Sequence, residues 1–415
     1  MNSSGPSPRQ PTKINVSCGQ TDLYPGCLKA LGQQLGTPIY YPPYWELEIA
    51  TIDMLQVLFN TKSDILLMEG CATYGGEAAL LSSLEAGEKA LFVITGKFGQ
   101  VWCDVAVCLG IETVELVVEP GDTVDAEQIE AALRADPDIK LVSVVHVETS
   151  MGTTNPIAAI GERIRSFPDT LYFVDAVSSL GAVPVNMDES GIDICLSSPQ
   201  KCINAPQGLA LLAVSEKGWH KVETRKTPIP SLCLDLTVWR QYHQAVRAAC
   251  EAAGEGREVR DVSFAGNREA KAAHGPSPSY VLVKALKASL EEIFDEGLEL
   301  VFRRHRTASR AVREAVRALG LGLEVKNEAA AAPVCTKIVW PEGLDRGKLG
   351  QWMQENYGVA LGGDRIGNMG FVASSHYMLP VIHALEMGLR AFGIQVPLGK
   401  GVEAARRIFA EAEEV

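Results

Sequence analysis

The feature that most constrains the fold of this chain is a pair of short apolar runs, each followed by a side chain that can carry a charge. Residues 171–174 are apolar, with β-branched and aromatic members, and end at Asp175; residues 192–196 are followed by Ser-Ser-Pro-Gln and Lys201. Both runs predict buried strands. A lone aspartate after a strand is more often a helix cap, and a lone lysine is usually a surface residue. Since ligands of open α/β sheets bind at the carboxyl ends of strands, we expect both charges in one crevice.

The combination of a buried lysine and a buried carboxylate suits catalysis with pyridoxal 5'-phosphate (PLP). A lysine amine forms a Schiff base with the cofactor aldehyde, and a carboxylate keeps the pyridinium nitrogen protonated so that the ring accepts electrons. Lys201 and Asp175 are therefore the predicted catalytic residues, and PLP is the predicted cofactor.

Three motifs, in the same order along the chain, resemble the class V PLP-dependent aminotransferases. They are Val-Asp-Ala-Val-Ser-Ser-Leu-Gly at 174–181, Gly-Ile-Asp-Ile at 191–194 and Ser-Pro-Gln-Lys-Cys-Ile-Asn-Ala-Pro-Gln-Gly at 198–208. The sequence is most similar to alanine–glyoxylate, serine–pyruvate and pyridoxamine–pyruvate aminotransferases. The resemblance extends from about Val16 to the C-terminus. It implies an α/β protein of PLP-dependent transferase fold type I and a homodimer with shared active sites.

Apolar runs alternate with helical patterns along the first two thirds of the chain. This alternation favours a mainly parallel sheet with helices on both faces, and the run at 208–214 is expected to close it. Apolar residues at helical spacing from Tyr280 to Leu298 predict one long helix leading into a smaller domain. We expect a flexible tail at 1–14, a large PLP-binding domain at 15–279 and a small α+β domain at 280–415.

A strand, a glycine-bearing loop and a helix follow one another around Cys71. The strand is expected at 65–68 and the helix from Glu77, an arrangement that binds phosphate because free N–H groups face the anion. The resemblance places Cys71, Ala72 and Thr73 at the cofactor phosphate. Alanine–glyoxylate relatives have Ser-Gly here, so Cys-Ala is a departure. Pyridoxamine–pyruvate relatives have an acidic residue near Cys71, and its absence argues against that assignment.

Further cofactor contacts are implied by the resemblance. An aromatic residue at the Phe98 position stacks on the pyridine ring, although Phe98 by itself also fits a core position. The hydroxyl of Thr149 contacts the phenolic side of the cofactor, and Val177 and Gln200 complete the set. His146, at the end of the predicted strand 141–146, is interpreted as structural and not catalytic.

Two segments are assigned to loops. Residues 40–45, Tyr-Tyr-Pro-Pro-Tyr-Trp, predict a loop that is either simply packed or lies near the active site and dimer interface, as in the family. The charged stretch 251–274 leads into Ala-His-Gly-Pro-Ser-Pro at 273–278. Family members carry a residue here that reaches the partner's cofactor phosphate, and His274 and Ser277 are both candidates.

Near the C-terminus, Gly-Gly-Asp-Arg-Ile-Gly-Asn-Met-Gly at 362–370 resembles the family's Arg-Ile-Gly-His-Met-Gly signature, with Asn368 in place of histidine. The resemblance makes Arg365 the ligand of the substrate α-carboxylate, for which the planar guanidinium provides two parallel hydrogen bonds. The glycines around it are expected to let the backbone approach a small ligand closely.

Composition excludes several other classes. A formal charge of −13 argues against a nucleic-acid surface, and no apolar run approaches the length of a membrane span. The first dozen residues lack the apolar region of a signal peptide. The ten cysteines contain no Cys-x-x-Cys pair, so we expect no metal site and a reducing, cytoplasmic environment.

The sequence thus predicts an aminotransferase that moves an amino group between a small amino acid, such as alanine or serine, and glyoxylate or pyruvate. A PLP lyase of the C–S lyase or desulfurase type remains an alternative, for which only Cys335 offers a candidate mobile cysteine. A catalytically inert binding protein is disfavoured by the intact Lys201, Asp175 and Arg365.

Overall fold

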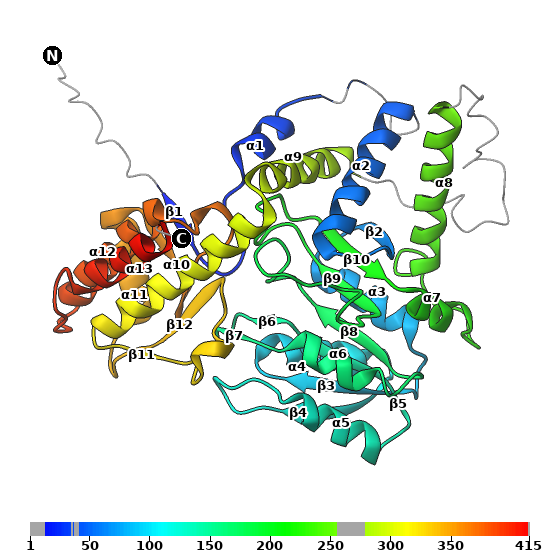
Figure 1. The fold of residues 1–415 in the computed structure, drawn as a ribbon, viewed down its shortest axis with the longest axis horizontal. Helices are drawn as coiled ribbons and strands as arrows, with labels where there is room; N and C mark the ends of the chain where they lie inside the picture. The colour runs from blue at the N-terminus through cyan, green and yellow to red at the C-terminus, as the bar shows by residue number, and fades with distance from the viewer. Residues whose placement is uncertain (1–12, 35, 37–40, 255–278, 414–415) are drawn as a thin grey trace. The chain divides into compact units, whose positions relative to one another are not determined.

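The structure is a computed structural model that describes residues 13–34, 36, 41–254 and 279–413. These residues form two compact units. The larger contains the described residues of 22–302 together with 325–332, and the smaller contains 13–21, 303–324 and 333–413. Figure 1 shows the elements of both units.

A seven-stranded sheet forms the centre of the larger unit, in the order β2-β10-β9-β8-β5-β3-β4. The strands are β2 Asp64–Glu69, β3 Lys89–Ile94, β4 Glu112–Val117, β5 Ile139–Val145, β8 Leu171–Asp175, β9 Ile194–Ser197 and β10 Leu209–Val214. Only β10 runs antiparallel to its neighbours, which confirms the mainly parallel sheet. The expectation that β10 closes the sheet is wrong, because β10 lies between β2 and β9. A hairpin of β6 Val147–Glu148 and β7 Thr153–Thr154 follows β5.

Helices connect the strands and extend the larger unit. They are α1 Pro25–Leu31, α2 Pro42–Phe59, α3 Ala72–Ser83, α4 Lys97–Cys108, α5 Ala126–Ala135, α6 Ile157–Ile164, α7 Glu216–Glu223, α8 Leu236–Gly254 and α9 Tyr280–Glu296. Helices α3 and α4 pack against the sheet, whereas α2 packs against α8 and α9 (Figure 1).

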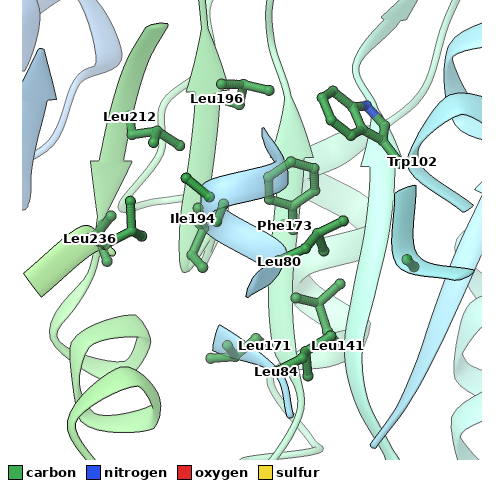
Figure 2. Packing of buried hydrophobic residues seen from close by; sticks show 14 of the residues in the cluster. Leu80, Leu84, Trp102, Leu141, Leu171, Phe173, Ile194, Leu196, Leu212 and Leu236 are labelled. Atoms are coloured by element: carbon green, nitrogen blue, oxygen red, sulfur yellow. The ribbon is translucent and has the colours of Figure 1, made fainter. Parts of the chain in front are cut away.

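The core of the larger unit lies between the sheet and the helices that cover it. All five residues of β8 are buried, which explains the continuous apolar run in the sequence. Figure 2 shows Trp102 of α4 beside Phe173 of β8, with Leu80 of α3 packed in the same cluster. The side chains of the site are therefore held by a close-packed interior.

Two helices begin inside segments that were predicted from the sequence to be loops. The predicted loop at 40–45 is wrong from Pro42 onward, because Pro42 opens α2; Tyr40 lies outside the described residues. Proline is well suited to the first helical position, where no N–H donor is needed. Tyr44 and Trp45 are buried against α8. The helix expected from Glu77 begins at Ala72, so that Cys71 is its N-cap.

The long helix predicted from Tyr280 to Leu298 is two helices. Gly297 adopts a φ of 90° and ends α9 after Glu296, and α10 Leu298–Ala318 follows directly. A φ of this sign is costly for residues other than glycine, and the apolar spacing alone carried no trace of the break.

The smaller unit is built around short strands covered by helices. It comprises β1 Ile14–Val16, β11 Gly322–Leu323, β12 Cys335–Val339, β13 Val359–Leu361, β14 Arg365–Gly367, α11 Arg346–Tyr357, α12 Ser375–Ala391 and α13 Lys400–Glu413, together with most of α10. Strand β1 pairs in parallel with β13, and β12 pairs antiparallel with β11 and β14. This mixed composition agrees with the expected α+β character.

Candidate active site

Four strands of the sheet bring the residues that follow them to the same end of the sheet. Strands β3, β5, β8 and β9 are parallel neighbours or near neighbours, so the residues that follow them meet at the same end. Asp175 is the last residue of β8, opposite Val145 of β5 and Leu196 of β9. Phe98 follows β3, Thr149 follows β5 and Lys201 follows β9. Strand direction therefore brings Asp175 and Lys201 to the same end of the sheet, as the sequence predicted.

Asp175 is buried, and each of its two carboxylate oxygens accepts one hydrogen bond. The backbone N–H of Val177 donates to Oδ1 at 2.9 Å, and the indole Nε1 of Trp102 donates to Oδ2 at 2.9 Å. Burial raises the pKa of Asp175, while these two donors and the charge of Lys201 act in the opposite direction. The carboxylate thus has a fixed orientation in a dry environment.

Lys201 is also buried, and it lies between a hydroxyl group and an aromatic ring. Its Nζ donates to Oγ of Ser178 at 2.7 Å and lies 5.0 Å from the centroid of the Phe98 ring. The turn that carries it is fixed by Ser198, whose hydroxyl bonds the Gln200 side chain and donates to the carbonyl of Leu209 at 2.9 Å. The amine is therefore confined to a small volume at the strand edge.

Glu148 fixes the start of α4, and with it the position of Phe98. Its Oε2 accepts from the backbone N–H of Phe98 and its Oε1 from that of Ser150, each at 2.9 Å. The hydroxyl of Ser150 in turn accepts from the N–H of Lys97 at 2.9 Å. A Cβ on Gly96 would lie 2.6 Å from Cγ of Glu148, so glycine is needed for this close approach. The first two N–H groups of α4 are thus capped by the β6 segment.

The N-terminus of α3 presents backbone N–H groups at the end of β2. Cys71 is the N-cap and accepts no hydrogen bond through its side chain, and Ala72 and Thr73 form the first turn. The helix packs directly on β9 and β10, since a Cβ on Gly75 would lie 2.5 Å from Cβ of Ala210. The uncapped N-terminus of this 12-residue helix is a favourable position for an anion.

His146 and Thr149 flank Glu148 and are both buried. The backbone N–H of His146 donates to the carbonyl of Asp175 at 2.9 Å, which ties the two strand ends together. Burial lowers the pKa of His146 to about 4, so its ring is neutral at physiological pH. Its Nδ1 has no hydrogen-bond partner among the described residues.

Arg365 belongs to the smaller unit. It opens β14, opposite Lys337 of β12, and its Nε lies 3.4 Å from Oδ1 of Asp364. Two of the neighbouring glycines lie against the chain after β1. A Cβ on Gly362 would lie 2.8 Å from Cα of Ser17, and one on Gly367 would lie 2.8 Å from the Ser17 carbonyl. These two glycines make room for the chain after β1, a packing role that the sequence did not predict.

Asn368, which replaces the family's histidine, supports the same turn. Its Nδ2 donates to the carbonyls of Pro333 at 2.8 Å and His305 at 3.2 Å, and the N–H of Gly370 donates to Nε2 of His305 at 2.9 Å. The amide therefore links β14 to α10 and to the segment before β12. His274 and Ser277 lie outside the described residues.

Three residues of the site were not predicted from the sequence: Trp102, Ser178 and Glu148. Ser178 lies inside the motif at 174–181, next to Val177, and Glu148 directly precedes Thr149. Trp102 lies four residues after Phe98, which places both on one face of α4. Spacing alone would have paired them, but only the packing identifies Asp175 as the acceptor of the indole N–H.

The described residues were also expected to contain no metal site and no membrane span. The part of the chain that the structure describes contains no group of three or more His, Cys, Asp or Glu side chains that could hold a metal ion. Among the helices formed by residues 13–254 and 279–413, leaving out the undescribed positions, none is long and apolar enough to cross a membrane.

Solved structures define the class of protein. A ureidoglycine–glyoxylate aminotransferase from Bacillus subtilis superposes with a TM-score of 0.85 at 27% identity, covering 96% of this chain and 98% of its own. The mainly parallel sheet with its smaller α+β unit is the structure of a PLP-dependent aminotransferase of fold type I.

Sequence comparison identifies the family. The model of the class V aminotransferases matches residues 52–229. The serine–glyoxylate aminotransferase of Methylorubrum extorquens is 32% identical over 86% of this chain and 86% of its own length. The pyridoxamine–pyruvate transaminase of Mesorhizobium japonicum is 29% identical over 94% of this chain and 95% of its own. The chain belongs to the class V aminotransferases, a family of enzymes that use PLP.

Proposed function

We propose that this enzyme binds PLP through Lys201 and moves an amino group between a small amino acid, such as alanine or serine, and a small keto acid, such as glyoxylate or pyruvate. The observation that carries the proposal is the pair of buried groups at one strand edge. The Lys201 amine lies against the Phe98 ring, and the Asp175 carboxylate has a fixed orientation.

The residues at this edge fit the cofactor. The N-terminus of α3 at Cys71, Ala72 and Thr73 has no side-chain cap, so its backbone N–H groups suit the cofactor phosphate. A buried carboxylate with both oxygens oriented suits its ring nitrogen, and Phe98 supplies an aromatic face for the ring. The remaining contacts follow the resemblance: Thr149, Val177 and Gln200.

When bound, PLP supplies an electron sink for the electron pair left by removal of the substrate's Cα proton. The chain's own contribution is to position and to transfer protons. The amine of Lys201, in its neutral form, would act as general base toward that proton. Ser178 lies within hydrogen-bond distance of Nζ and restricts its movement. Burial of both groups excludes water from the proton transfer.

Recognition of the substrate is assigned to Arg365 in the smaller unit. Its guanidinium pairs with an α-carboxylate through two parallel hydrogen bonds, and the fold around β14 holds it in place. We further propose a homodimer with shared active sites, in which His274 or Ser277 contacts the partner's cofactor phosphate. A cytoplasmic location agrees with the ten cysteines, none of which forms a disulfide bond.

The choice of small substrates is supported by relatives. Those compared above are named for serine with glyoxylate, for ureidoglycine with glyoxylate and for pyridoxamine with pyruvate. The N-cap of α3 is Cys71, where pyridoxamine–pyruvate relatives have an acidic residue nearby, so an amino acid donor is favoured over pyridoxamine.

The test is a half-reaction panel. Purified enzyme loaded with PLP is mixed with alanine, serine, other amino acids and pyridoxamine, and conversion of the cofactor to its amino form is followed by absorbance. Stoichiometric conversion by alanine or serine, reversed by glyoxylate or pyruvate, supports the proposal. Release of sulfide or ammonia would instead indicate lyase chemistry. Cys335, the only cysteine considered for a desulfurase, is buried on β12 and is poorly placed for that role.

A further inference from the structure

Helix α4 delivers two side chains to the site. Phe98 lies in its first turn and Trp102 one turn later, at positions i and i+4 of one face. Phe98 lies against the amine of Lys201, and Trp102 donates to the carboxylate of Asp175. One rigid element therefore contacts both of the predicted catalytic groups.

The contact of Trp102 with Asp175 is a charge-assisted hydrogen bond in the protein interior. The Nε1···Oδ2 distance is 2.9 Å, and the residues are 3% and 5% exposed. The N–H of Val177 donates to Oδ1, so the indole N–H provides the hydrogen bond to the other carboxylate oxygen, Oδ2. Bonds of this type are stronger than those between neutral groups, and they fix the rotation of the carboxylate.

The indole has little freedom to leave this position. A Cβ on Gly76 of α3 would lie 2.2 Å from ring atoms Cη2 and Cζ3, so the absence of a side chain there makes room for the ring. Phe173 packs edge-on at a centroid distance of 5.7 Å and an angle of 76°. Figure 2 shows the indole at the end of the cluster, beside Phe173 and Leu196. The surrounding packing thus determines the direction of the N–H.

We propose that Trp102 is a positioning residue, whose indole N–H holds the Asp175 carboxylate ionised and oriented toward the ring nitrogen of the cofactor. The inference rests on the proposed function for its catalytic meaning. The hydrogen bond itself is a property of the protein without cofactor and can be tested there.

The charges around Asp175 set the sign of the expected pH effect. Burial raises the pKa of Asp175 above its unfolded value; the Val177 N–H, Lys201 and Trp102 lower it again, and Glu148 raises it. Cys195 is close enough for the charge of Asp175 to add to burial in raising the pKa of its thiol. With the folded pKa raised, the protein loses stability as pH rises through the interval between the two pKa values. Removing the indole N–H widens this interval, so the cost of its removal is larger at neutral than at acidic pH.

The variant Trp102→Phe keeps an aromatic ring and removes the donor. Trp239→Phe is the matched control, because Trp239 is buried in the same cluster and its Nε1 donates at 2.8 Å to the backbone carbonyl of Cys233. Both variants are also made in an Asp175→Asn background. Urea unfolding of the cofactor-free proteins is measured at neutral and acidic pH, and PLP affinity is measured by absorbance titration.

The expected result is a destabilisation by Trp102→Phe that grows from acidic to neutral pH and becomes independent of pH in the Asp175→Asn background. Trp239→Phe should show no such dependence. PLP affinity and kcat/KM should fall about ten- to a hundredfold for Trp102→Phe, as expected for loss of a bond to a charged group, and much less for the control.

A destabilisation by Trp102→Phe that is the same at both pH values overturns the proposal, as does a PLP affinity equal to that of Trp239→Phe. Failure of the wild-type protein to bind PLP would overturn the proposed function, and with it the catalytic role of Trp102. The unfolding data would then still decide whether the indole holds an ionised carboxylate.

Discussion

Replacement of Glu148 by glutamine tests whether the β6 segment holds the first turn of α4 in place. Glu148 is completely buried and accepts two backbone N–H groups, those of Phe98 and Ser150, each at 2.9 Å. A glutamine side chain has the same shape but only one accepting oxygen. One N–H therefore faces the NH₂ group of the amide and loses its partner.

The magnitude follows from these two bonds. Loss of a hydrogen bond to a charged acceptor costs about 1.5–3 kcal/mol, and a buried donor left unpaired costs about 1–3 kcal/mol. These terms overlap, so we expect Glu148→Gln to lower the free energy of unfolding by about 2–4 kcal/mol. Because the displaced N–H can be that of Phe98, PLP affinity should fall as well.

The assay is urea unfolding of the cofactor-free protein, followed by absorbance titration with PLP. Glu127→Gln is the control, since the Glu127 side chain is 75% exposed and lies 3.6 Å from Arg163 in a surface ion pair. Such pairs contribute little, so unfolding should change by less than about 0.5 kcal/mol. Equal stability of the two variants would refute the idea that Glu148 caps α4.

Three further substitutions test the proposed chemistry. Lys201→Ala should abolish turnover while leaving non-covalent PLP binding at the start of α3; turnover near that of the wild type would exclude the Schiff-base role. Asp175→Asn should keep the fold but reduce kcat about 10²–10³-fold, on the scale of other preorganised electrostatic contacts, and a change below about tenfold would leave Asp175 as a structural residue. Arg365→Lys should reduce kcat/KM for amino and keto acids about ten- to a hundredfold with unchanged PLP affinity, as measured by steady-state kinetics and titration. Unchanged kcat/KM for every carboxylate substrate would rule out a carboxylate-binding Arg365.

The positions of the central strands and the family followed from the sequence. Strands that are buried on both faces are continuous apolar runs, as in β8 and β9, and the polar residues that end them mark the edge where ligands bind. Asp175 and Lys201 could thus be placed together before any coordinates were known. The motifs around them also specified the family, because several residues at defined separations carry more information than any one alone.

Element boundaries and strand direction were less accessible. Helix α2 begins at Pro42 and α3 at Ala72, before the residues with apolar periodicity, because the first turn of a helix need not contribute to the core. The sequence of β10 resembles that of the parallel strands of the sheet. Burial on both faces gives the same apolar composition whatever the direction of the strand. The break at Gly297 similarly leaves the apolar spacing intact.

By itself, the sequence determined which residues are chemically capable of PLP catalysis and which strands lead to them. Only the tertiary structure decided what holds them. The partners of Asp175 and Phe98 come from segments 73 and 50 positions away, Trp102 and Glu148. Glycines at 76 and 96 make room for these contacts. Local periodicity reports which face of an element is buried, whereas a hydrogen bond between distant elements depends on how the chain returns to the sheet.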